Sequence, residues 1–120
     1  MSQQPKKKKV GITATEVKKL YDMCEEYKTK SRSLLESHYK EDFVLSEMAY
    51  EWVSEMASTS LFLQKTLEKT FPSLDEDTKD PEKRVYSLPP EYIQKLAKST
   101  LILADIKNDL IKCSISMDYQ

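Results

Sequence analysis

Apolar residues recur along the chain at spacings of three and four, which is typical of helices packed lengthwise against other helices. The first series follows a helix-start signal, in which Thr13 can accept a hydrogen bond from the Glu16 amide while Glu16 reaches back to Thr13. We therefore expect the first helix over about residues 13–38. Its predicted inner seam comprises Val17, Leu20, Cys24, Tyr27, Ser31, Leu34 and His38.

The apolar series lapses at residues 38–42, where the next seam position falls on Glu41, and this predicts a break. A second helix is expected over about 42–70, ending before Pro72 because the residue preceding a proline is pushed out of helical geometry. Its predicted inner face comprises Leu45, Met48, Ala49, Trp52, Val53, Met56, Leu63 and Leu67. The alternative is one continuous helix in an oligomeric coiled coil.

Residues 72–89 are rich in acidic side chains and proline, which predicts a long loop. Pro89, Pro90 and Glu91 then indicate a third helix over about 90–112, because proline is tolerated in a first helical turn and an acid is favoured there. The predicted inner face comprises Tyr92, Ile93, Leu96, Thr100, Leu103, Ala104, Leu110 and Ile111, with Lys107 on the same side.

The last residues, 113–120, alternate apolar and polar side chains, which is the period of a strand. Ile115, Met117 and Tyr119 are therefore candidates for adding a strand to the sheet edge of a partner. A frayed tail is the alternative.

Composition favours helix throughout. A chain of 120 residues fits one domain, and its single glycine, Gly11, is too few for a fold with many tight turns. We expect an all-α protein, an antiparallel three-helix or four-helix bundle with long helices over residues 12–112. A disordered basic tail, 1–11, would precede the bundle, and a flexible tail, 113–120, would follow it.

Catalytic and cofactor chemistry finds no support in the residues. The chain has one histidine, His38, no glycine-rich phosphate loop, and two cysteines, Cys24 and Cys113, without metal-ligand spacing. We expect no enzyme activity, no cofactor and no bound metal. A membrane is not an expected partner either, because no apolar run approaches the ~18 residues of a spanning helix.

Two short segments are candidates for regulation. Lys6, Lys7, Lys8 and Lys9 follow Pro5 and resemble a monopartite nuclear import signal, so a nuclear or nucleocytoplasmic location is expected. The alternatives are an electrostatic contact with nucleic acid or with acidic partners, and a solvated tail without function. Ser73 precedes an acidic cluster and is a candidate phosphorylation site.

These features favour a non-enzymatic helical interaction subunit or adaptor of a larger assembly, acting on a protein partner or on a second copy. Aromatic residues and methionine are enriched at interfaces, and core packing is their alternative role. The candidate interface residues are Met48, Trp52, Met56, Phe62 and Lys107. The alternative is a nucleic-acid-associated protein that uses the tail and the first helix, although acidic side chains nearly balance the basic side chains of that helix. An adaptor whose helix groove receives a peptide is not separable from the first interpretation by sequence.

Overall fold

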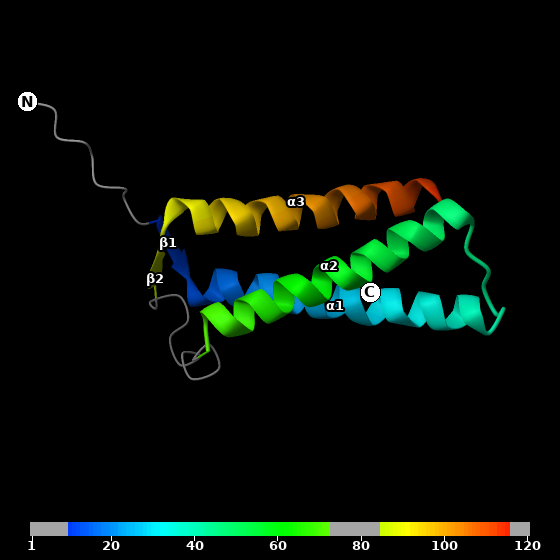
Figure 1. The fold of residues 1–120 in the computed structure, drawn as a ribbon, viewed down its shortest axis with the longest axis horizontal. Helices are drawn as coiled ribbons and strands as arrows, with labels where there is room; N and C mark the ends of the chain where they lie inside the picture. The colour runs from blue at the N-terminus through cyan, green and yellow to red at the C-terminus, as the bar shows by residue number, and fades with distance from the viewer. Residues whose placement is uncertain (1–9, 73–84, 116–120) are drawn as a thin grey trace, which may run out of the picture.

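The computed structural model describes residues 10–72 and 85–115, of which 78% are helical. The elements are, in order, β1 (Val10–Thr13), α1 (Ala14–Tyr39), α2 (Glu47–Thr70), β2 (Val85–Leu88) and α3 (Pro90–Lys112). Consecutive helices run in opposite directions, and α2 lies between α1 and α3 (Figure 1). The two strands lie beside the first turns of α1 and α3 (Figure 1).

The start of α1 confirms the predicted capping box. The Glu16 amide donates to Thr13 Oγ1 over 3.1 Å, and the Thr13 amide donates to Glu16 Oε1 over 3.4 Å. Both backbone donors would otherwise lack a partner in the first turn of a helix.

The end of α1 confirms the predicted break, and a continuous helix into α2 is wrong. The Asp42 amide donates to the Ser37 carbonyl over 2.9 Å, and the Glu41 amide donates to the His38 carbonyl over 3.1 Å. This pair of bonds forms a Schellman motif, which requires a left-handed residue just past the helix. Glu41 takes that position with φ 63°.

The second helix begins at Glu47, so the expected start at residue 42 is wrong. The Ser46 hydroxyl accepts a hydrogen bond from the Ala49 amide over 3.2 Å and caps α2. The amide of the buried Leu45 donates to His38 Nδ1 over 3.0 Å, which holds the connection between the helices in a non-helical path.

The two strands are an addition to the expected all-α fold. They pair antiparallel, with Val10 opposite Leu88 and Thr13 opposite Val85. Residues 10–11 therefore do not belong to the basic tail, nor residues 85–88 to a loop. A Cβ at Gly11 would lie 3.0 Å from Val85 Cγ1, so the single glycine of the chain lies where the strands approach closely.

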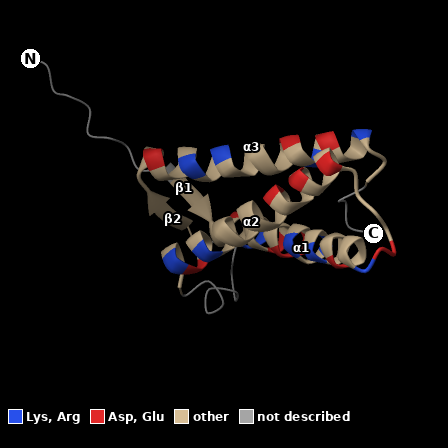
Figure 2. Ribbon diagram, turned by 45° about the vertical axis from the view of Figure 1, so that its right-hand side comes forward, with Lys and Arg blue, Asp and Glu red and all other residues tan. Residues whose placement is uncertain are grey.

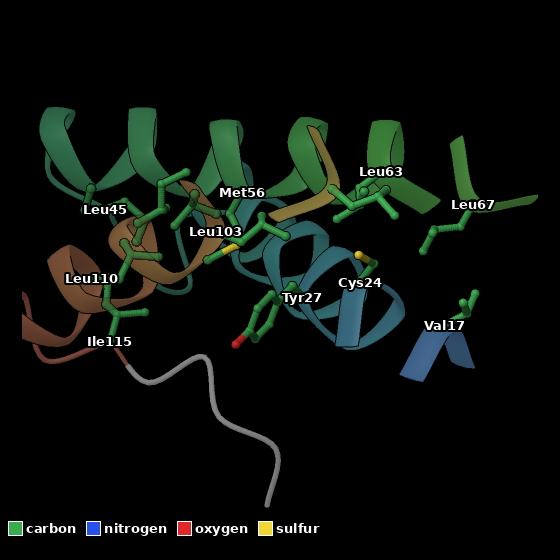
Figure 3. Close-up of a cluster of buried hydrophobic side chains, with 14 of the residues drawn as sticks. Val17, Cys24, Tyr27, Leu45, Met56, Leu63, Leu67, Leu103, Leu110 and Ile115 are labelled. Atoms are coloured by element: carbon green, nitrogen blue, oxygen red, sulfur yellow. The ribbon is translucent and has the colours of Figure 1, made fainter. Parts of the chain in front are cut away.

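The hydrophobic core lies mainly along α2 and is completed from α1 and α3. Figure 3 shows side chains from all three helices meeting below α2, together with Leu45 and Ile115 from beyond the helix ends. The fully or nearly fully buried residues include Val17, Cys24, Tyr27, Met56, Leu63, Leu67, Leu103 and Leu110. Three residues predicted to face the core are instead exposed: Met48, Ala104 and Ile111. Ile106 is buried without having been predicted.

Ile115 is buried at the end of α3, so its side chain is not available to add a strand to the sheet edge of a partner. Its amide donates to the Leu110 carbonyl over 2.9 Å, and the Ser114 amide donates to the Ile111 carbonyl over 2.9 Å. This is a second Schellman motif, with Ser114 at φ 63° and an apolar contact between the two ends of the turn. Met117 and Tyr119 lie outside the described residues.

Candidate protein-interaction surface

Exposed apolar side chains gather where α1 turns into α2. Phe43 is 48% exposed, Val44 67% and Met48 59%, and Tyr39 lies exposed at the end of α1. We call these four residues the hairpin-end patch. Large apolar side chains that cluster on a surface usually mark a site of interaction.

The backbone beneath the hairpin-end patch is anchored on both sides. The buried Leu45 and its hydrogen bond to His38 fix the middle of the connection. The hydroxyl groups of Tyr39 and Tyr50 are hydrogen-bonded to each other, and the Tyr50 ring lies 5.0 Å from the His38 ring between centroids. Phe43 and Val44 are therefore presented outward by a supported connection.

Acidic residues flank the hairpin-end patch along the chain. Glu41, Asp42, Glu47 and Glu51 are all exposed, and Lys40 is the basic residue within segment 39–51. Lys40 itself is paired with Glu36 over 2.8 Å. The patch is therefore an apolar surface with a negative rim.

The structure separates the interface residues that the sequence suggested. Met48 belongs to the hairpin-end patch, and Trp52 lies one turn further along α2, half-buried. Phe62 is 68% exposed but lies more than three turns beyond Met48, and Met56 is fully buried in the core. Lys107 is half-buried on α3.

The sequence pattern did not single out Tyr39, Phe43 and Val44 as exposed apolar residues. The signal was available in Phe43 and Val44, two adjacent apolar residues within a polar stretch just beyond the predicted break. Both residues were expected within a second helix starting at residue 42, beyond its inner face, whereas that helix begins only at Glu47.

The exposed face of α1 carries charges of both signs (Figure 2). Lys18, Lys19 and Arg32 are exposed, and so are Asp22 and Glu26. No continuous basic stripe, the usual footprint of a nucleic-acid-binding helix, lies along α1. Lys6, Lys7, Lys8, Lys9 and Ser73 lie outside the described residues.

Cys24 is buried in the core, and His38 holds the connection between α1 and α2. Burial raises the pKa of the Cys24 thiol to about 12, and Cys113 is exposed and unbonded. His38 Nδ1 is occupied as an acceptor.

Over residues 10–72 and 85–115, no three His, Cys, Asp or Glu side chains are grouped so that they could hold a metal ion. Within the same ranges, no helix combines the length and hydropathy needed to cross a membrane.

No protein-family model, curated protein or solved structure matches this chain. The function proposed below therefore rests on the residues of this chain alone.

Proposed function

We propose that this protein is a non-enzymatic helical interaction subunit and that the hairpin-end patch binds a protein partner. The observation that carries the proposal is the exposure of Phe43, Val44 and Met48 on an anchored connection. Removing apolar surface from water contributes roughly 25 cal/mol per Å². A supported backbone also lowers the entropy lost on binding, so contact with a partner is favoured.

The charge of the rim defines the class of partner. The four exposed carboxylates would repel the phosphates of nucleic acid and attract basic side chains of a protein; they are Glu41, Asp42, Glu47 and Glu51. The partner that fits is a protein segment with apolar residues flanked by Lys or Arg, such as a basic amphipathic helix.

The wider architecture and location belong to the same proposal. The opposite directions of consecutive helices and the packing of α2 against both neighbours support an antiparallel bundle in solution. Lys6, Lys7, Lys8 and Lys9 would direct the protein to the nucleus. Replacing these four lysines with alanine in a fluorescent fusion should abolish nuclear accumulation, and unchanged accumulation would contradict this part of the proposal.

The binding test compares a patch variant with a matched control. Phe43→Ser/Val44→Ser removes two of the four apolar side chains of the hairpin-end patch, whereas Phe62→Ser removes an exposed aromatic residue outside it. Proteins captured from nuclease-treated nuclear extract by the wild type and by Phe62→Ser, but not by the patch variant, are purified and titrated. We expect a dissociation constant at least tenfold higher for the patch variant, equivalent to about 1.4 kcal/mol.

Circular dichroism of each variant establishes that the helices are intact. Capture that is equal for the patch variant and the wild type would contradict the proposal, as would capture of no protein. Capture that occurs in untreated extract, is absent after nuclease treatment and falls steeply with salt would instead support the nucleic-acid function.

A further inference from the structure

The third helix carries a second seam, apolar at four of its six positions, that lies outside the core. Its members are spaced by three and four residues: Gln94, Ala97, Leu101, Ala104, Asn108 and Ile111. All six are exposed, with Leu101 at 61% and Ile111 at 48%. We call this the outer seam of α3.

A separate seam of the same period attaches α3 to the protein. Tyr92, Leu96, Ser99, Leu103, Ile106 and Leu110 make up this inner seam, and each is buried or half-buried. The inner seam accounts for the packing of α3 within the chain. The outer seam has the spacing of a coiled-coil interface and no role in that packing.

The charges beside the outer seam identify what can cover it. Glu91, Lys98, Asp105 and Lys112 follow one another at intervals of seven residues along one flank, and all four are exposed. In an antiparallel pair of helices, such a flank meets the same flank of the partner helix. Because the charges alternate in sign, a second copy of α3 would place Lys98 beside Asp105 of the second copy, and Glu91 beside its Lys112.

The same register also fits the sizes of the apolar side chains. It sets Leu101 against Ala104 of the second copy, twice, so that a large side chain faces a small one at the centre, with Ala97 opposite Asn108 and Gln94 opposite Ile111 further out. A parallel pair would set the alanines against each other and bring Lys107 beside Lys112 of the second copy, where like charges repel. Antiparallel pairing is therefore favoured.

We propose that the protein forms a dimer in which α3 packs antiparallel against α3 of a second copy through the outer seam. The helix has 23 residues and is about 34 Å long, so the seam extends over some three heptads. This surface is distinct from the hairpin-end patch, and the dimer does not depend on the proposed function.

Light scattering coupled to size-exclusion chromatography of the full chain, at several concentrations, measures the mass. We expect a dimer for the wild type and a monomer for Leu101→Glu, which places a charge in the outer seam without touching the core. Ile102→Glu is the matched control, because Ile102 is also exposed on α3 but lies outside the seam, and it should remain a dimer.

A charge exchange identifies the second copy as the occupant. Lys98→Glu alone should raise the dissociation constant of the dimer at least tenfold, because two attractions become two repulsions. Adding Asp105→Lys should restore it. A monomeric wild type, a dimer that persists in Leu101→Glu, or a double variant as weak as Lys98→Glu would each overturn the proposal. The variant Phe43→Ser/Val44→Ser should remain dimeric, which separates this result from the test of the hairpin-end patch.

Discussion

Glu41 and Ser114 occupy a backbone conformation that most side chains avoid. Each has φ 63° and each follows the end of a helix, α1 and α3 respectively. The left-handed region costs a residue with a Cβ roughly 1–2 kcal/mol, and glycine is the usual occupant. With its single glycine at position 11, the chain forms both turns from ordinary residues.

Replacing Glu41 with glycine should therefore stabilise the protein. We expect Glu41→Gly to raise the free energy of unfolding by about 0.5–1 kcal/mol, since relief of the strain exceeds the added entropy of the unfolded chain. Urea denaturation followed by circular dichroism measures the change. Glu41→Ala is the control, because it removes the carboxylate but keeps the Cβ. Equal stabilisation by alanine would show that charge, not backbone geometry, is responsible.

The two cysteines should differ sharply in reactivity. The thiolate is the reactive form, and burial raises the pKa of Cys24 to about 12, whereas Cys113 is exposed beyond α3. A thiol reagent such as dithiobis(nitrobenzoate) should label one cysteine of the native protein and both in denaturant. Cys113→Ser should abolish native labelling, and rapid labelling of that variant would show that the α1–α2 contact opens readily.

At the scale of the elements, a polar network links α1 to α2. Gln64 is 2% exposed; its amide donates to Glu25 Oε2 over 2.6 Å and its carbonyl accepts from Lys28 Nζ over 2.8 Å. Lys28 also pairs with Glu25 over 2.7 Å. Both the carbonyl oxygen and the amide nitrogen of the Gln64 side chain thus have a partner on α1. These bonds favour one register between the two helices.

This network should make stability depend on pH. The hydrogen bond from Lys28, followed by that from Gln64, lowers the pKa of Glu25 below its ordinary value of 4.5. A lowered pKa in the folded state contributes stability that is present above the unfolded pKa and is lost as the pH falls through the folded pKa. Between pH 7 and about pH 3, Glu25→Gln should therefore lose less stability than the wild type.

Unfolding in urea at each pH measures this dependence. Glu26→Gln removes a neighbouring exposed carboxylate outside the network and controls for net charge. The same pH profile for Glu25→Gln and the wild type would contradict the assignment.

Sequence patterns predicted the elements whose signals are local. The capping box of Thr13 and Glu16 lies within four residues, and it marks the start of α1 correctly. The predicted start of α2 was wrong because the amide of Leu45 donates to His38, seven residues away, which leaves the local cap at Ser46 as the point where the helix begins. The predicted inner face of α3 combined residues of the inner and the outer seam. Two seams of equal period lie on that helix, and the period alone does not show which one is buried.

At the scale of the whole molecule, the sheet is what the sequence did not predict. Strands of four residues are too short to show alternation, and β1 and β2 lie more than seventy residues apart in the chain. Their pairing joins the segment before α1 to the segment before α3. The hairpin-end patch was missed for a related reason, because its exposure depends on where Leu45 packs.

The sheet should hold the start of α3 in place, and Tyr86 is the residue that tests this. Its ring lies 4.7 Å from that of the buried Phe71 between centroids, which joins β2 to the end of α2. Tyr86→Ala should lower the free energy of unfolding by about 1–2 kcal/mol, since the ring is only half-buried.

Hydrogen exchange of this variant should show protection lost mainly in β1, β2 and the first turns of α3, because local opening follows the contacts removed. Ser87→Ala, at an exposed position of the same strand, should leave protection unchanged. A loss spread evenly over α1 and α2 would mean that the sheet stabilises the whole fold rather than the attachment of α3.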